Sequence, residues 1–222
     1  MTVPLGVEAV IFDLDGVLVD TVELHFHGWK ALAAELGVPF DRAVNDRLRG
    51  LRREPSLEVV LGARAVQFGD HERCELIERK NADFLARLEE MTPADLAPGA
   101  RELLGFLSQR GVRAALASSS RNARAVIERL GIAAAFGAVV DGVAAPRSKP
   151  DPQVFLLAAS RLAVSPAACL VIEDGEAGIA AARAAGMRVF GIGPAERVGG
   201  ADRVFERLGD IRAEDLAPLL RA

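Results

Sequence analysis

The sequence is short of the residue types on which several classes of protein depend. Its 222 residues contain no tyrosine and one tryptophan, which argues against an aromatic platform for stacking nucleic-acid bases. The net charge of −4 gives no electrostatic attraction to nucleic acid. The two cysteines, Cys74 and Cys169, lie in different segments without a CxxC or zinc-type spacing. This usage is typical of a reduced, cytoplasmic protein.

Long apolar runs are missing as well. No stretch reaches the roughly 20 apolar residues that a membrane-spanning helix needs. The first ten residues, MTVPLGVEAV, lack the charged start and the extended apolar run of a secretory signal. We therefore expect a cytoplasmic protein with no membrane and no nucleic-acid partner. We also expect a monomer. Its length is sufficient for a sizeable core, in one domain or in a domain with an insertion.

Short apolar runs alternate with segments of helical spacing along most of the chain. This alternation predicts an α/β fold, a doubly wound parallel sheet with helices on both faces. The predicted strands are residues 9–13, 113–118, 138–140, 169–173 and 188–192.

The region from residue 21 to residue 91 differs, because it has helical spacing throughout and no strand pattern. We interpret it as an α-helical cap inserted after the first strand. The predicted core domain is residues 1–17 with 92–222, and the predicted cap is residues 18–91. Hinges are expected near residues 17–20 and near 92–99, where Pro93 and Pro98 interrupt helix.

The segment VIFDLDGVLVDT, residues 10–21, ends an apolar run with two carboxylates, Asp13 and Asp15. Successive residues of a strand point to opposite faces, so these two share a side only where the strand has ended and turned. Gly16 allows that turn. Two buried acids need a cation or hydrogen bonds. A lone DxD is most often an acidic turn, but three further polar clusters follow apolar runs downstream.

The first of these clusters follows the run RAALA. It consists of hydroxyl, basic and amide side chains just before a helical pattern: Ser118, Ser119, Ser120, Arg121 and Asn122. A helix start offers free N–H groups and the positive end of its dipole, which suits a phosphate. An ordinary turn with Ser120 as the helix cap is the alternative.

The remaining clusters are Lys149, which precedes Pro150, and the pair Glu173 and Asp174, which ends the run CLVIED. Ligands of open α/β sheets bind outside the carboxyl ends of the strands, where strand order reverses. If the strands are parallel neighbours, the acids, the serine and the lysine converge there. Carboxylates with phosphate oxygens suit Mg²⁺. The set predicts Mg²⁺-dependent phosphoryl transfer.

In these four motifs the chain resembles the haloacid dehalogenase superfamily, and in its cap segments it resembles the β-phosphoglucomutase subfamily. The matching cap segments are Thr21-x-x-x-His25, Trp29-Lys30, NDRLRGLRREPSL, ERKNADFL and MTPADLAPG. The resemblance covers essentially the whole chain. It implies a Rossmann-like core of that superfamily, a Mg²⁺ cofactor and a sugar phosphate as substrate.

Asp13 is then expected to be the nucleophile that forms an aspartyl phosphate, and Asp15 the general acid and base. The resemblance implies that Asp13, Asp15 and Asp174 hold the metal, Asp15 also through its backbone carbonyl. Glu173 either ligates the metal or orients Lys149, and the sequence leaves both open. Ser118 and Lys149 are expected to hold the transferring phosphoryl oxygens.

A mutase also binds the far phosphate of a sugar bisphosphate, and Arg53 is the candidate because a guanidinium fits phosphate bidentately. The other expected phosphate- and substrate-binding residues are Thr21, His25, Trp29, Arg49, Gly50, Leu51, Ser56, Lys80, Ser119, Ser120, Arg121 and Asn122. Arg49 stands where relatives often have lysine, and Arg52 adds charge; a solvated basic helix end is the alternative for both. His25, with Lys80, either positions Asp15 or is structural. His27 and His71 are expected at the surface.

Three functions compete on these residues. The leading hypothesis is a β-phosphoglucomutase, which interconverts β-glucose 1-phosphate and glucose 6-phosphate through β-glucose 1,6-bisphosphate. The second is a sugar phosphate phosphatase, in which water replaces the second sugar. The third, a non-enzymatic phosphosugar sensor, conflicts with the intact Asp13 and Asp15. Dehalogenase chemistry is disfavoured because a halide leaving group needs no protonation by Asp15.

Overall fold

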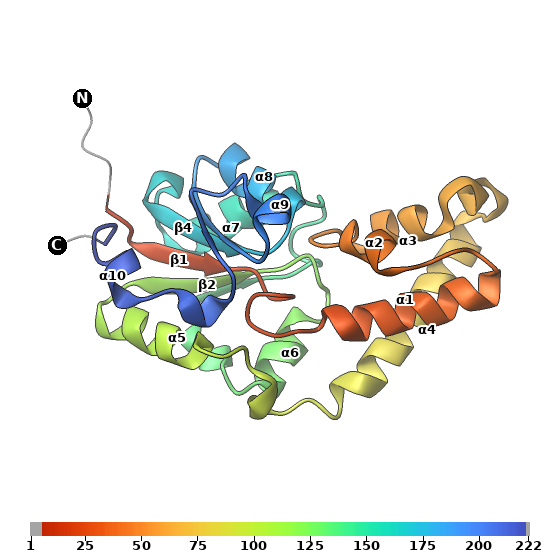
Figure 1. The fold of residues 1–222 in the computed structure, drawn as a ribbon, viewed down its shortest axis with the longest axis horizontal. Coiled ribbons are helices and arrows are strands. Elements are labelled where there is room, and N and C mark those ends of the chain that lie inside the picture. Colours follow the sequence, from red (N-terminus) through yellow and green to blue (C-terminus); the bar gives the residue numbers. More distant parts are fainter. Residues whose placement is uncertain (1–5, 221–222) are drawn as a thin grey trace.

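The computed structural model of the protein describes residues 6–220 and has two parts, a sheet covered by helices and a group of helices beside it (Figure 1). The prediction that no secretory signal is present concerned residues 1–10. Residues 1–5 of that segment lie outside the described residues. Within residues 6–220 no helix combines the length and the apolar character needed to cross a membrane.

The strands of the described chain are β1 (Ala9–Phe12), β2 (Arg113–Ala117), β3 (Ala138–Val140), β4 (Cys169–Glu173), β5 (Arg188–Ile192) and β6 (Arg203–Phe205). The α-helices are α1 (Val22–Leu36), α2 (Arg42–Asp46), α3 (Arg53–Leu61), α4 (Asp70–Leu88), α5 (Ala100–Gln109), α6 (Ala123–Arg129), α7 (Gln153–Leu162), α8 (Glu176–Ala184), α9 (Ala195–Val198) and α10 (Ala213–Leu216). Short 3-10 helices span Gly62–Gln67, Pro93–Asp95, Ala133–Ala135, Pro166–Ala168 and Leu208–Asp210.

Among residues 6–220 the strands form one parallel sheet in the order β3-β2-β1-β4-β5-β6. The order reverses at β1, which has β2 on one side and β4 on the other, so the predicted doubly wound fold is confirmed. The five predicted strands form within one residue of their predicted ends. β6 was not predicted, because its three residues are largely exposed at the sheet edge and show no apolar run.

Each face of the sheet has its own hydrophobic core, because successive residues of a strand point to opposite faces. Val10 and Phe12 of β1 pack in the core under α5 and α6, whereas Ala9 and Ile11 pack in the core under α7 and α8. Figure 1 shows these helices on the two sides of the sheet. The strand ends are therefore fixed from both faces.

The predicted helical cap is confirmed as a separate group of helices, α1 to α4, at one end of the sheet (Figure 1). These helices enclose a hydrophobic core of their own, which includes Trp29, Leu57 and Leu76. The two connections between cap and core run side by side: Val19 forms an antiparallel bridge with Leu96. These connections coincide with the segments that were predicted as hinges.

Candidate active site

The loop after β1 turns the paired aspartates into one cavity. The N–H of Asp13 still donates to the carbonyl of Ile172 on β4, at 2.9 Å. Gly16 then adopts a φ of +83°, where a side chain is strained, and its N–H donates to the carbonyl of Val19 at 2.8 Å. As a result Asp13 and Asp15 both line the same cavity.

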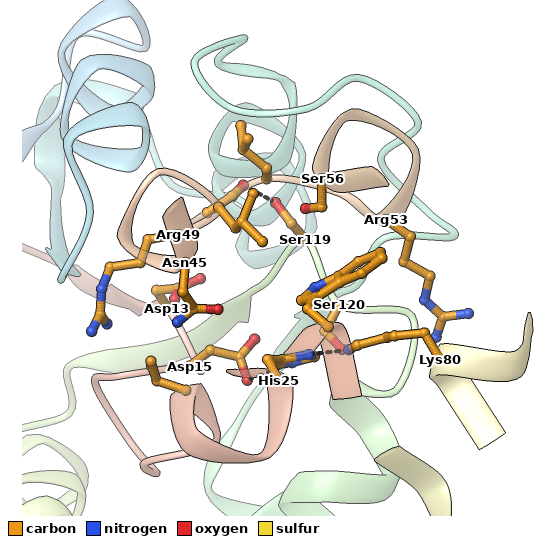
Figure 2. Close-up of a pocket in the computed structure, with 15 residues that line it drawn as sticks. Asp13, Asp15, His25, Asn45, Arg49, Arg53, Ser56, Lys80, Ser119 and Ser120 are labelled. Carbon is orange, nitrogen blue, oxygen red and sulfur yellow. Dashed lines mark hydrogen bonds and ion pairs between the residues drawn. The ribbon is translucent and has the colours of Figure 1, made fainter. Parts of the chain in front are cut away.

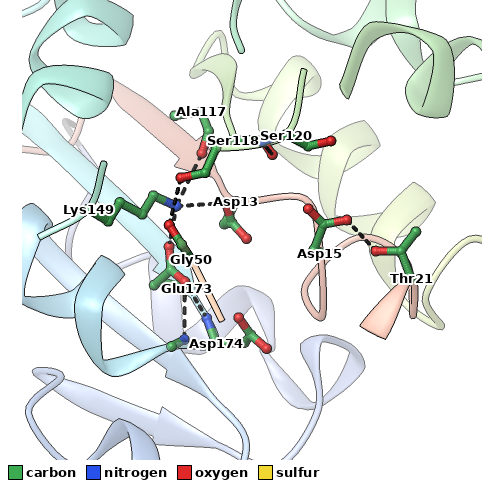
Figure 3. Close-up of polar contacts among 12 residues, drawn as sticks. Asp13, Asp15, Thr21, Gly50, Ala117, Ser118, Ser120, Lys149, Glu173 and Asp174 are labelled. Carbon is green, nitrogen blue, oxygen red and sulfur yellow. Dashed lines mark hydrogen bonds and ion pairs between the residues drawn. The ribbon is translucent and has the colours of Figure 1, made fainter. Parts of the chain in front are cut away.

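Three neighbouring strands bring the sequence motifs together at their carboxyl ends (Figure 3). Asp13 follows β1, Ser118 follows β2, and Glu173 and Asp174 lie at the end of β4. The three acids Asp13, Glu173 and Asp174 are buried, and they offer carboxylate oxygens within 4.8 Å of one another. This is the place where the strand order reverses and where open α/β sheets bind ligands.

Lys149 is the cation that pairs with two of these acids, Asp13 and Glu173. Its Nζ donates to Asp13 Oδ1 at 2.7 Å, to Glu173 Oε2 at 2.8 Å and to the carbonyl of Ala117 at 3.4 Å (Figure 3). Burial alone would lower the pKa of Lys149, but the carboxylates of Asp13 and Glu173 outweigh it and raise that pKa above its usual range. Lys149 is thus a fixed positive charge beside Asp13.

The contacts of Glu173 bear on its two predicted roles. One of its oxygens accepts from Lys149, and the other accepts from the backbone N–H groups of Asp174 and Gly175, both at 3.1 Å. Burial and the neighbouring Asp13 raise the pKa of Glu173, and Lys149 opposes that rise. Both oxygens therefore have donors, which favours orientation of Lys149 over ligation of a metal.

The buried acids fit a divalent cation. Burial raises the pKa of Asp174 to about 7, and Asp13 adds to that rise, so a positive charge between these carboxylates would stabilise their ionised forms. Oxygen donors of this kind suit a hard cation such as Mg²⁺. The side chain of Asp15 is not in the cluster, because its carboxylate accepts a hydrogen bond from the hydroxyl of Thr21 (Figure 3).

Asp15 is in a setting that suits an acid. Burial, and next the charge of Asp13, raise its pKa from 3.8 to about 6, while Thr21 and two lysines oppose the rise. Near neutral pH a fraction of Asp15 therefore carries a proton that it can donate. His25 approaches from the cap, with Nε2 at 3.9 Å from Asp15 Oδ1.

His25 and Lys80 form a second polar pair in the cap. Lys80 Nζ hydrogen-bonds Nδ1 of His25, and the imidazole stacks on Phe84 with the ring centres 4.5 Å apart. Burial, and next the charge of Arg53, lower the pKa of Lys80 to about 7. Burial, and next Lys80, hold the pKa of His25 well below 6.5. His25 is therefore neutral, and Nε2 is free to carry the proton that faces Asp15.

Cap and core together enclose the cavity shown in Figure 2. Twelve of the predicted residues line it: Asp13, Asp15, His25, Trp29, Arg49, Gly50, Leu51, Arg53, Ser56, Lys80, Ser119 and Ser120. Val22, Asn45 and Leu48 also line it and were not predicted. The signal for Asn45 was weak, a polar residue in the segment NDRLRG, and only the fold shows that it is buried.

The other predicted residues do not line this cavity. Thr21 binds Asp15, the Oγ of Ser118 accepts from the N–H of Ser120 at 3.0 Å, and Lys149 binds Asp13. The alternative interpretation of this turn, with Ser120 as the cap of α6, is not what the structure has. The Oγ of Ser120 accepts from the N–H of Asn122, and Asn122 itself precedes the helix. The chemical roles of all these residues remain predictions.

The end of the cavity away from the aspartates is basic (Figure 2). Arg53 Nη2 donates to Asn122 Oδ1 at 3.2 Å, and Asn122 Nδ2 donates to Asn81 Oδ1 at 2.9 Å. Arg121 Nη2 donates to Glu54 Oε1 at 2.5 Å. Burial, and next the charge of Arg121, lower the pKa of Arg53. An arginine of the core, Arg121, is therefore close enough for its charge to act on Arg53 of the cap.

Further contacts hold the cap on the core. The hydroxyl of Ser119 donates to the carbonyl of Gly50 at 2.6 Å. Arg49 pairs with the carboxylate of Asp174, and Arg52 donates to the carbonyl of Pro146. The side chains of Arg49 and Arg52 are each 16% exposed, so neither is a solvated helix end. His27 and His71 are exposed, as predicted.

Comparison with known proteins adds an independent result. The family model described as haloacid dehalogenase-like hydrolase matches residues 7–186. A β-phosphoglucomutase of Bacillus subtilis is 46% identical over 93% of this chain and 92% of its own length. A phosphorylated carbohydrates phosphatase of Thermotoga maritima is 33% identical over 83% of this chain and 85% of its own. The crystal structure of a β-phosphoglucomutase from Clostridium difficile superposes with a TM-score of 0.92, at 34% identity and 96% coverage of both chains.

Proposed function

We propose that this protein is an enzyme that acts as a β-phosphoglucomutase. The chain belongs to the haloacid dehalogenase-like hydrolase family. It would interconvert β-D-glucose 1-phosphate and D-glucose 6-phosphate through β-glucose 1,6-bisphosphate. The similarity to β-phosphoglucomutases over nearly the whole chain supports this proposal.

One observation within the structure carries the choice of a mutase: Arg53 faces the core from the cap, at the opposite end of the cavity from Asp13 (Figure 2). A guanidinium with a lowered pKa in a half-buried setting gains from an anionic partner. A sugar bisphosphate has one phosphate for each end. Turning that molecule within the site would exchange the two phosphates.

The residues at the core end fit the roles proposed for them. A carboxylate oxygen of Asp13 would attack phosphorus, forming the bond of an aspartyl phosphate while the bond from phosphorus to the sugar oxygen breaks. Asp15 would give its proton to that oxygen and take one from the acceptor hydroxyl in the second half-reaction. Lys149 and Ser118 would hold the phosphoryl oxygens, where negative charge develops.

We further propose that the metal is Mg²⁺, held by the carboxylates of Asp13 and Asp174 and by the backbone carbonyl of Asp15. When bound, it would neutralise charge on the transferring group. Residues 18–91 would act as the cap domain and residues 1–17 with 92–222 as the core domain. The protein would act as a cytoplasmic monomer.

The test is to incubate the purified protein with Mg²⁺, β-glucose 1-phosphate and a trace of β-glucose 1,6-bisphosphate, and to follow products by ³¹P NMR. We expect glucose 6-phosphate in large excess over inorganic phosphate. Inorganic phosphate without glucose 6-phosphate would identify a phosphatase instead.

Asp13→Asn should lower either activity at least about 10⁴-fold. Labelled phosphate retained on that variant would refute the role of Asp13 as the nucleophile. Full activity in EDTA would refute the metal.

A further inference from the structure

Arg49 is a cap residue whose guanidinium lies in the core. It stands in the segment between α2 and α3, and Nη1 pairs with Asp174 Oδ2 just after β4. On the cap side its Nε donates to Asp46 Oδ1 at 3.2 Å. Its side chain is 16% exposed and that of Asp174 2%. Figure 2 shows Arg49 and Arg53 at opposite ends of the cavity, so Arg49 is remote from the predicted far-phosphate site.

Two glycines lie close to the pair formed by Arg49 and Asp174. A Cβ on Gly16 would overlap Asp174 Oδ2 and would lie 3.1 Å from Arg49 Nη1. A Cβ on Gly175 would lie 3.3 Å from the Cβ of Arg49. Gly16 therefore lies against the carboxylate and the guanidinium, and Gly175 lies against the start of the Arg49 side chain. A larger residue at either glycine would disturb the pair.

The charges of the acid cluster are divided between two cations. Lys149 binds Asp13 and Glu173, whereas the carboxylate of Asp174 pairs with Arg49. Arg197 also approaches Asp174, but its Nε donates to the backbone carbonyl, at 2.8 Å. A divalent cation in this cluster would use the carboxylate whose Oδ2 pairs with Arg49, and two cations on one carboxylate repel each other.

We propose that Arg49 and the metal ion are alternative partners of Asp174, which makes Arg49 a positioning residue that links cap closure to the state of the metal site. The inference rests on the proposed function for the presence of a metal. Cap closure through Arg49 weakens metal binding, and metal binding releases one cap contact. The two effects are equal in free energy because linkage is reciprocal.

The test is calorimetric titration of Mg²⁺ alone into the protein after removal of metals with EDTA. Arg49→Gln should bind Mg²⁺ about 5- to 50-fold more tightly than the wild type, the range expected for loss of one charge-assisted competitor. Arg47→Gln removes an exposed cap arginine with the same change of charge and should stay within about twofold of the wild type.

Arg197→Gln separates direct competition for the carboxylate from the general effect of a nearby positive charge. Arg197 binds the backbone carbonyl of Asp174, whereas Arg49 pairs with the carboxylate. If Arg197→Gln tightens Mg²⁺ binding as much as Arg49→Gln, or if Arg49→Gln binds no tighter than the wild type, the inference is wrong. Loss of Mg²⁺ binding in every variant and in the wild type would overturn the proposed metal site as well.

Hydrogen exchange supplies the reciprocal readout. Added Mg²⁺ should speed exchange of the backbone amides of residues 49–53 in the wild type, because the cap loses its contact with Asp174. The same amides in Arg49→Gln should exchange faster without metal and change little when Mg²⁺ is added. Slower exchange of this segment in the wild type on adding Mg²⁺ would contradict the proposal.

Discussion

At the core end of the site Lys149 lies between two carboxylates. At the cap end the cap's own residues Lys80, Arg53 and His25 lie near one another. The pKa of Lys149 rises above its usual range because its partners outweigh burial. The pKa values of the three cap groups all fall, because burial is the largest cause in each and a neighbouring cation adds to it. Glu78 approaches Arg53 only to 4.0 Å.

This difference indicates what each end can do. The core end carries its own counter-charges, so Asp13 and Lys149 are held in place before a substrate arrives. The cap end carries positive charge that is costly to bury, and a bound phosphate would relieve that cost. An anion with two phosphates satisfies both ends, which agrees with the proposed bisphosphate.

The largest expected effect is the loss of stability in Lys149→Met, which changes the core end alone. It leaves Asp13 and Glu173 buried without their cation, and such a loss costs about 3–5 kcal/mol of the free energy of unfolding. Urea unfolding at pH 7 with EDTA measures it. The double variant Lys149→Met with Glu173→Gln removes one of the stranded charges and should recover at least about 1 kcal/mol. A Lys149→Met variant as stable as the wild type would show that Lys149 does not offset the buried charges of Asp13 and Glu173.

Arg53→Ala should come next and act on the cap end alone. Losing one charge-assisted phosphate contact should lower kcat/KM for isomerisation about ten- to a hundred-fold. Hydrolysis of acetyl phosphate needs no second phosphate and should be far less affected. Arg47→Ala, an exposed cap arginine, is the matched control. Equal loss of both activities in a folded Arg53→Ala protein would remove the far-phosphate role.

The smallest effect concerns the titration of Lys80. Its folded pKa of about 7 is below the unfolded value of 10.5, so between these values the unfolded state binds more protons and stability rises with pH. From pH 7 to pH 9 the free energy of unfolding of the wild type should rise by on the order of 1–2 kcal/mol relative to Lys80→Met. Urea unfolding of both proteins across that range measures the difference. A constant difference would mean that Lys80 stays fully charged in the cap.

The sheet and the motif positions were predictable because both depend on local patterns. An apolar run of four or five residues predicts a buried strand, and polar residues directly after the run must lie at the strand's carboxyl end. Asp13, Ser118 and Asp174 could therefore be assigned to one edge of the sheet. β6 and Asn45 could not, because a short exposed strand has no periodicity and burial of one amide depends on helices distant in the sequence.

The sequence by itself determined which groups are present at the site and which strands carry them. Only the tertiary structure decided how their charges are paired: that Glu173 uses both oxygens on Lys149 and on backbone N–H groups, and that Arg49 of the cap reaches Asp174 of the core. The physical reason is that ion pairs depend on distance through space. Arg49 and Asp174 are 125 residues apart along the chain, and no local pattern links them until the cap closes on the sheet.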